Sequence, residues 1–167
     1  ENDSTYGKMH TFLWGISAKP RIQILDRALG KLLIDEVPVT VLRKERNPVS
    51  IPWRDHGVKV VVDCTGQFLD PTLSMDEAKG SLRGDLNGGA YVVIASSAFK
   101  IKNKALNEPP DAVTLIYGVN HHSFQAARHQ LVSAASCTTT ALAHMLHPLL
   151  ENEKTSRILT ASMSTIH

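Results

Sequence analysis

Short apolar runs rich in β-branched residues recur along the chain and predict strands. Most are continuous rather than strictly alternating, and they occupy residues 31–35, 37–42, 59–62, 91–95, 114–117 and 131–133. A continuous apolar run is typical of a strand that is covered on both faces, as in a parallel sheet. The pattern therefore predicts an α/β fold with a mostly parallel sheet.

Two segments predict helices. The polar segment 71–86 lies between two strand candidates and ends at the break Asn87-Gly-Gly89, so it predicts the helix of a strand–helix–strand unit. Residues 138–150 place apolar side chains at helical spacing, and we expect Pro148 to bend or end this helix near its last turn. The segment 158–166 returns to β-rich sequence and predicts another strand.

The segment 30–42 departs from the parallel pattern, because two apolar runs meet at Asp35-Glu36. Two such runs around a tight turn predict an antiparallel hairpin within the mostly parallel fold. Residues 100–111 are polar and contain Pro109-Pro110, so they predict a surface loop.

The composition indicates a soluble globular protein. Of the 167 residues 43% are hydrophobic, and 18 Lys and Arg nearly balance 16 Asp and Glu. This even balance argues against a nucleic-acid or membrane-surface partner, and no apolar stretch reaches the roughly 20 residues of a membrane span. The two cysteines, Cys64 and Cys137, lie in dissimilar contexts and favour a reducing compartment, so we expect the cytoplasm.

Cys137 stands directly before the predicted helix at 138–150. A thiol at a helix N-terminus faces unpaired backbone N–H groups and the positive end of the helix dipole, which favour the thiolate. The hydroxyls of Ser136, Thr138 and Thr139 offer hydrogen bonds to an anionic group beside a reacting carbon. An isolated Ser-Cys-Thr-Thr is more often a small buried thiol with capping hydroxyls. These residues alone leave both interpretations open.

A collinear series of short motifs resembles the glyceraldehyde-3-phosphate dehydrogenase family. Around the cysteine, Ala135-Ser-Cys-Thr-Thr139 is similar to the active-site signature of the family. The other similar segments, in chain order, are Asp3-Ser-Thr-Tyr-Gly7, Glu45-Arg-Asn-Pro48, Ile51-Pro-Trp53, Asp63-Cys-Thr-Gly-Gln-Phe68, Gly88-Gly-Ala-Tyr-Val-Val-Ile94, Gly118-Val-Asn120 and Ser164-Thr-Ile-His167. A single motif would be weak evidence for the family. The series is strong evidence, because its motifs follow the family's order over almost the whole chain.

The resemblance implies catalytic roles for two residues. Cys137 would form a thiohemiacetal and then a thioester with the aldehyde, and His167 would activate the thiol and act as acid or base on the substrate oxygen. Ser136 and Thr138 would lie near inorganic phosphate. The implied reaction is the NAD-dependent, phosphorylating oxidation of glyceraldehyde 3-phosphate, a step of glycolysis.

The resemblance also implies a cofactor cleft, an assembly and a division of the chain. The family assembles as homotetramers. Residues 1–136 would be a partial dinucleotide-binding domain with a truncated, doubly wound, Rossmann-like sheet, and residues 137–167 would begin an α+β catalytic domain. The residues implied to contact NAD are Arg46 near the adenine, and Thr65, Gly66, Phe68 and Ser96 on the nicotinamide side.

Several features depart from the family pattern. Thr140 stands where Asn is usual, Tyr6 stands where the motif has His, and residues 12–29 do not align with the family. The sequence has no Gly-x-Gly-x-x-Gly turn to hold a pyrophosphate. It also begins without Met and ends inside a predicted strand. We therefore expect a piece of a longer protein that is inactive by itself.

Two other functions stay open. Erythrose-4-phosphate dehydrogenase, a relative with the same Cys and His, is compatible with several of the same motifs. Alternatively, the chain is a non-catalytic fragment or pseudoenzyme that acts by protein association. We expect no metal site: His144 and His147 share a helical face, but His121, His122 and His129 lie at no ligand spacing from them.

Overall fold

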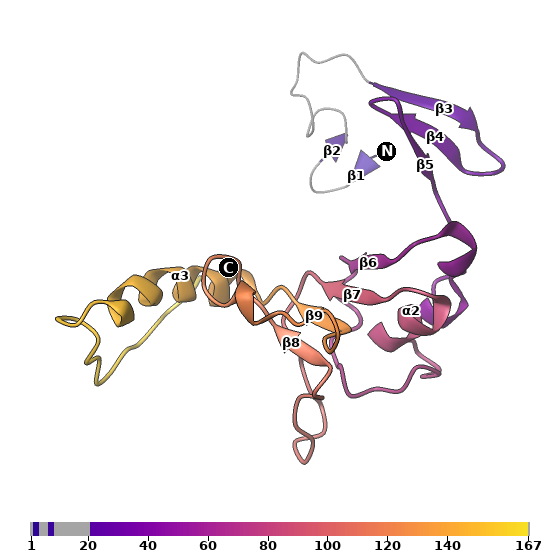
Figure 1. The fold of residues 1–167 in the computed structure, drawn as a ribbon. Coiled ribbons are helices and arrows are strands. Elements are labelled where there is room, and N and C mark those ends of the chain that lie inside the picture. The colour runs from indigo at the N-terminus through magenta and orange to yellow at the C-terminus, as the bar shows by residue number, and fades with distance from the viewer. Residues whose placement is uncertain (1, 4–6, 9–20, 167) are drawn as a thin grey trace. The chain divides into compact units, whose positions relative to one another are not determined.

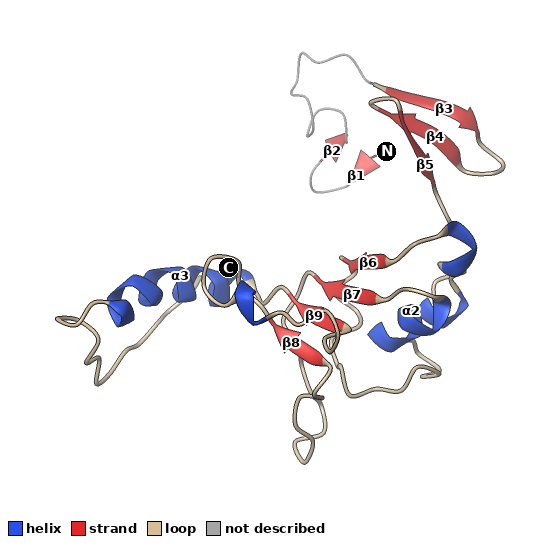
Figure 2. Cartoon of the chain, viewed as in Figure 1, coloured by secondary structure: helices blue, strands red, loops and turns tan. Residues whose placement is uncertain are grey.

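The computed structural model describes residues 2–3, 7–8 and 21–166, and within them the fold is mixed α/β, as predicted (Figures 1 and 2). The chain divides into two compact units, Glu1–Glu45 and Arg46–His167. The division at residues 136 and 137 that the family resemblance implies falls inside the second unit and stays a prediction.

The first unit contains two small antiparallel sheets among its described residues. One joins β1 (Asn2–Asp3) to β2 (Gly7–Lys8). The other has the order β3–β4–β5 and is made of β3 (Ile22–Asp26), β4 (Lys31–Ile34) and β5 (Val37–Thr40). The apolar runs in the sequence predicted no strand at β3.

The predicted hairpin is confirmed as β4 and β5. Its turn residues, Asp35 and Glu36, both adopt positive φ, 47° and 66°. Two consecutive residues with positive φ form the two-residue turn whose twist matches that of the flanking strands. Glycine adopts positive φ more readily than Asp or Glu does. The pairing of the two strands must therefore help to hold the turn.

The second unit is built on a parallel sheet with the strand order β6–β7–β9–β8. Its strands are β6 (Val60–Asp63), β7 (Val92–Ala95), β8 (Ala112–Thr114) and β9 (Leu131–Ser133). The last residues of the strands are in register, with Asp63 beside Ala95, Ala95 beside Ser133 and Ser133 beside Thr114. Four chain segments therefore leave the sheet along one edge (Figure 1).

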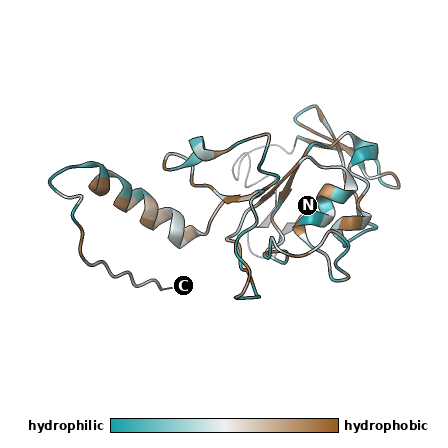
Figure 3. Cartoon of the chain, turned by 60° about the horizontal axis from the view of Figure 1, so that its bottom comes forward, coloured by the Kyte–Doolittle hydropathy of each residue, from teal (hydrophilic) through white to brown (hydrophobic). Residues whose placement is uncertain are grey.

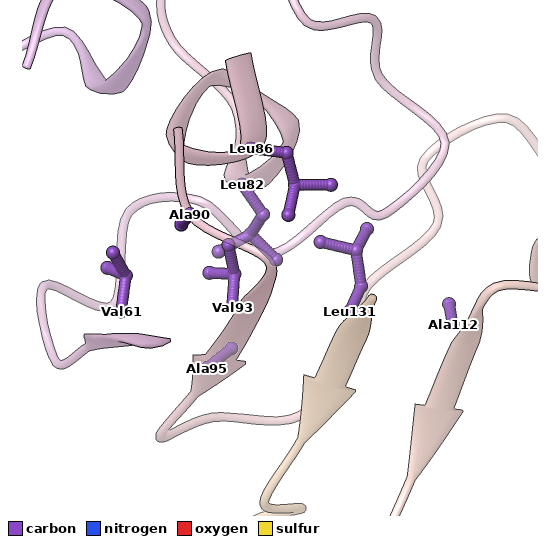
Figure 4. Close-up of a cluster of buried hydrophobic side chains, with 8 residues drawn as sticks. All are labelled: Val61, Leu82, Leu86, Ala90, Val93, Ala95, Ala112 and Leu131. Atoms are coloured by element: carbon purple, nitrogen blue, oxygen red, sulfur yellow. The ribbon is translucent and has the colours of Figure 1, made fainter. Parts of the chain in front are cut away.

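The core of the second unit lies between this sheet and α2 (Leu82–Gly88). Leu82 from α2 and Val93 and Leu131 from the sheet are at most 1% exposed (Figure 4). On β6 the burial alternates, so that Val61 is in the core while Val60 and Val62 are exposed on the opposite face. Our expectation that both faces of the sheet are covered is therefore wrong for β6.

The helix predicted over 71–86 begins only at Leu82, so the prediction is wrong for residues 71–81. Gly80, with φ of 86°, lies against Phe68 so closely that a Cβ atom there would be 2.7 Å from the Phe68 ring. Ser81 then caps the helix, because its side chain accepts a hydrogen bond from the Gly84 N–H at 3.2 Å. Side-chain hydrogen bonds hold the preceding residues in turns: Thr72 N–H donates to Asp70 Oδ1 at 3.0 Å, and the Ser81 hydroxyl donates to the Ser74 carbonyl at 2.6 Å.

Two predicted strands differ from those in the structure. The strand expected at 114–117 is found two residues earlier as β8 (Ala112–Thr114). After Thr114 the backbone bonds to the Asn120 side chain instead of to a strand. This side chain accepts from Ile116 N–H at 2.7 Å and donates to the Thr114 carbonyl at 3.0 Å. The strand expected at 158–166 is absent from that segment, which is exposed. A β-rich segment without a neighbouring strand has no ladder to join.

The remaining elements agree with the predictions. The segment 100–111 is a loop, and α3 (Cys137–Glu151) confirms the helix expected at 138–150. Pro148 lies inside α3, which ends within one turn of it. No residue of α3 is buried, and Figure 3 shows hydrophobic and hydrophilic residues mixed along it. The three short 3₁₀ helices are η1 (Pro48–Ser50), η2 (Arg54–His56) and η3 (His121–Ser123).

A bidentate ion pair joins α2 to the start of β8. The two terminal nitrogens of Arg83 donate to the two carboxylate oxygens of Asp111 at 2.7 and 2.8 Å. The Arg83 guanidinium holds the pKa of Asp111 below its ordinary value, with partial burial opposing the shift. The Asp111 carbonyl accepts from Gln130 and Leu131 N–H at 2.9 and 3.1 Å. Asp111 therefore fixes α2, β8 and β9 to one another.

Asp85 on α2 is a buried carboxyl group, 3% exposed. Its Oδ1 accepts a hydrogen bond from Trp53 Nε1 at 2.7 Å. Burial raises the pKa of Asp85 to about 6; the Trp53 hydrogen bond opposes this shift, and the charge of Asp63 adds to it. The Asp63 carboxylate is itself buried, and its Oδ2 has no hydrogen-bond partner among the residues that the structure describes.

This buried carboxyl should make the protein less stable as the pH rises from about 4 to about 6. The folded-state pKa of Asp85, about 6, lies above the ordinary value of 3.8, so the folded state binds more protons in this interval. Each unit of pKa corresponds to about 1.4 kcal/mol, so we expect the free energy of unfolding to fall by on the order of 2 kcal/mol. Denaturant unfolding across this pH range measures the change.

Asp85→Asn should flatten this dependence, because the amide still accepts from Trp53 but carries no charge. The matched control is Asp55→Asn, a change at an exposed residue of the same unit, which should leave the slope unchanged. An equally steep decline in both variants would contradict the assignment.

Candidate active site

Cys137 is the first residue of α3, and its side chain is exposed. The preceding Ser136 is the N-cap, and its Oγ accepts from Thr139 N–H at 3.2 Å. The same oxygen lies 2.8 Å from Thr139 Oγ1 and 3.4 Å from Thr138 Oγ1. The Ser136 hydroxyl therefore caps the helix, but the thiol is exposed and not the small buried group of the alternative interpretation.

The turn between β9 and α3 is only three residues long, from Ala134 to Ser136. Ala134 N–H still donates to the Ala95 carbonyl at 2.9 Å, which continues the contact with β7. Ala135 then adopts φ of 61°, a conformation uncommon for a residue other than glycine. The sequence carries no signal for this, because alanine has no preference for positive φ.

Thr65, Gly66 and Ser96 lie at the same sheet edge as Cys137. After β6 ends, Thr65 N–H donates to Asp63 Oδ1 at 2.7 Å and Gln67 N–H donates to Thr65 Oγ1 at 3.2 Å. Gly66 has φ of 66° and open space around its Cα, and Ser96 N–H donates to the Asp63 carbonyl at 2.9 Å. Exposed groups beyond the carboxyl ends of parallel strands form the usual ligand-binding edge of an open α/β sheet.

Phe68 and Arg46, two further predicted cofactor contacts, lie in the segments before α2. Phe68 is half-buried and packs against the core. Arg46 is exposed, and the side chain of its neighbour Asn47 caps η1 and donates to the Ala78 carbonyl at 3.3 Å. Their roles as cofactor contacts stay predictions.

The segment Gly118-Val-Asn120 forms the loop that follows β8 and reaches α3. Gly118 has φ of 85°, and a Cβ atom there would lie 3.2 Å from Cε1 of His144 on α3. The loop is held by Asn120 and by the hydrogen bond from Gly118 N–H to His121 Nδ1, 3.0 Å. Gly118 thus allows the close approach of this loop to the helix that begins with Cys137.

No protein-family model matches the chain. Among curated proteins, glyceraldehyde-3-phosphate dehydrogenase of Mycoplasma pneumoniae is 38% identical over 136 residues, which are 81% of this chain and 34% of that protein. The enzyme of the same name from Treponema pallidum is 38% identical over 120 residues, 72% of this chain and 30% of that protein. The glycosomal enzyme of Crithidia fasciculata is 33% identical over 136 residues, 81% of this chain and 32% of that protein.

The chain belongs to the glyceraldehyde-3-phosphate dehydrogenase family. It spans about a third of the length of the curated relatives that it matches. The members of this family are dehydrogenases by name, and so the chain comes from a family of oxidoreductases.

His167, the second catalytic residue that the family resemblance implies, lies outside the described residues. The pairing of Cys137 with His167 therefore stays a prediction. The segment Asp3-Ser-Thr-Tyr-Gly7 also falls largely outside them. Within the described part of the chain, no group of three or more His, Cys, Asp or Glu side chains is placed to hold a metal ion. No described helix has the length and apolar character needed to cross a membrane.

The groups that follow the ends of β6 and β7 form an open edge of the sheet. Thr65, Gly66 and Ser96 present exposed backbone and hydroxyl groups at one edge, and nothing lies within 4 Å of a Cβ atom placed on Gly66. Ligands of open α/β sheets bind beyond the carboxyl ends of the strands, where these groups lie. Their contact with NAD stays a prediction, and the sequence has no glycine-rich turn of the kind that holds a pyrophosphate.

Proposed function

We propose that the protein containing this chain is a phosphorylating, NAD-dependent glyceraldehyde-3-phosphate dehydrogenase of glycolysis, with Cys137 as its nucleophile. The observation that carries the proposal is the exposed thiol at the N-terminus of α3, a helix of 15 residues. The helix dipole and the N–H groups of its first turn favour an anionic substrate at this position. Family membership supplies the reaction class.

In this mechanism His167 takes the proton of the Cys137 thiol and gives it to the aldehyde oxygen as the sulfur adds to the aldehyde carbon. The same imidazole removes that proton again as the carbon is oxidised. NAD, when bound, supplies the hydride acceptor. A thioester on Cys137 results, and an oxygen of inorganic phosphate attacks its carbonyl carbon. The carbon–sulfur bond then breaks, so that an acyl phosphate and the Cys137 thiolate are released.

Other residues of the chain would bind and orient these reactants. Ser136 and Thr138 flank Cys137 in the chain, with their hydroxyl oxygens 3.4 Å apart, and would donate to the attacking phosphate. The residues that would contact the nicotinamide side of NAD are Thr65, Gly66, Phe68 and Ser96. Arg46 would approach the adenine. We place the enzyme in the cytoplasm as a homotetramer, without a nucleic-acid or membrane partner.

The test is to follow NADH formation by the full-length gene product that contains this chain. With glyceraldehyde 3-phosphate and NAD, we expect turnover that depends on inorganic phosphate and a product that is an acyl phosphate. Faster turnover of erythrose 4-phosphate would identify the related dehydrogenase instead. Absence of NADH with either aldehyde, from a folded protein, would favour a non-catalytic role in protein association.

Replacing His167 with Asn in the full-length protein should lower turnover by about two to four powers of ten, the usual loss for a general acid–base group. The KM for the aldehyde should change much less, because His167 acts on protons and not on binding. The control is His56→Asn, at an exposed residue of η2, which should leave turnover unchanged. Comparable losses in both variants would argue against a catalytic role for His167.

A further inference from the structure

Ser133, the last residue of β9, joins three parts of the second unit. It is fully buried, 0% exposed. Its hydroxyl donates to the Ser97 carbonyl at 2.8 Å and accepts from Ala135 N–H at 3.0 Å. Its own carbonyl accepts from Leu115 N–H at 2.9 Å. Ser133 therefore links the chain after β7, the chain after β8 and the turn that leads to α3.

The hydrogen bond to Ala135 acts on the strained residue of that turn. A non-glycine residue with φ of 61° persists only where its surroundings hold it. Ala135 is 2% exposed, and its amide is bonded to the Ser133 hydroxyl rather than to backbone. Since this hydroxyl is also fixed by Ser97, it cannot rotate away without losing a second bond.

The conformation of Ala135 decides where α3 begins. Only Ser136 separates Ala135 from Cys137, and Ser136 is already the N-cap. If Ala135 relaxed to negative φ, the chain would leave β9 in another direction, and the first turn of α3 would move away from the edge that carries Thr65 and Ser96.

We infer that Ser133 is a positioning residue, which acts through Ala135 to hold the Cys137 thiol in place at the N-terminal end of α3. The inference rests on the proposed function, because it takes Cys137 as the nucleophile. It concerns a residue that contacts neither substrate nor cofactor. The effect of Ser133 must therefore appear in the reactivity of Cys137 and not only in stability.

The experiment measures alkylation of both cysteines by iodoacetamide as a function of pH, with peptide mapping. Cys64 is exposed at the same sheet edge and is an internal reference in every sample. In the unmodified chain, Cys137 should react faster than Cys64 near neutral pH. Ser133→Ala should slow Cys137 about tenfold at neutral pH and move its rate profile to higher pH, with Cys64 unchanged.

Two further variants distinguish a positioning role of Ser133 from a general loss of folded structure. Ser97→Ala keeps the backbone carbonyl that accepts from Ser133, so its Cys137 profile should match that of the unmodified chain. In the double variant Ser133→Ala with Ala135→Gly, glycine adopts positive φ without strain, so the reactivity of Cys137 should return.

An unchanged Cys137 profile in Ser133→Ala would overturn the inference, and so would equal slowing of Cys64. If Ser133→Ala does not fold, the double variant decides: a folded double variant with slow Cys137 would overturn the inference. If Cys137 does not outpace Cys64 even in the unmodified chain, the proposed nucleophile itself is wrong. That outcome is distinct from a failure of the role of Ser133.

Discussion

Replacing Cys137 with serine should lower glyceraldehyde 3-phosphate oxidation by the full-length gene product by on the order of five to six powers of ten. A serine hydroxyl is not ionised at neutral pH, and an ester is a poorer acyl donor to phosphate than a thioester is. Serine also suits the start of α3, so the fold should persist. Formation of NADH measures the loss, and circular dichroism checks that the fold is retained.

The matched control is Cys64→Ser, because Cys64 is also exposed and also lies just beyond the carboxyl end of a parallel strand. Unlike Cys137, it is not at a helix N-terminus. This variant should keep at least half of the activity. A larger loss from Cys64→Ser than from Cys137→Ser would sink the assignment of the nucleophile.

Leu131→Ala should destabilise the second unit by about 2–5 kcal/mol, the usual cost of a large-to-small change in a core. Leu131 is 0% exposed and lies on β9, the strand that pairs with both β7 and β8. In Figure 4 its side chain points into the cluster formed with Leu82 and Leu86 of α2. The cavity left by alanine would therefore lie in the centre of that cluster.

Denaturant unfolding measures this loss, which is a large part of the stability of an ordinary domain. The control is Leu159→Ala, at a residue that is 97% exposed, and its effect should stay within about 0.5 kcal/mol. Equal effects of the two substitutions would show that the α2–sheet cluster does not carry the stability of the unit.

Local features of the fold were predicted well where neighbouring residues determine them. The hairpin at β4 and β5 follows from two apolar runs around Asp35-Glu36. The start of α3 follows from Ser136 and the threonines after it, because a hydroxyl before a helical pattern is a cap. The parallel sheet follows from short β-branched runs separated by polar segments.

Predictions failed where contacts beyond the immediate sequence neighbours decide the conformation. Residues 71–81 have helix-compatible composition, but hydrogen bonds from Thr72 to Asp70 and from Ser81 to the Ser74 carbonyl hold them in turns. Residues 158–166 have strand composition, but a strand needs a partner, and this segment has none in the structure. The β8 strand is displaced because a side chain six residues after Thr114 bonds back to it.

The sequence by itself determined the family, through motifs whose order survives at 33–38% identity, and it determined that Cys137 stands at a helix start. Only the tertiary structure decided which groups accompany the thiol. The register of Asp63, Ala95, Ser133 and Thr114 brings four separate segments to one edge. The same register lets the Ser133 hydroxyl hold Ala135 at positive φ, a conformation that no local preference of alanine would produce.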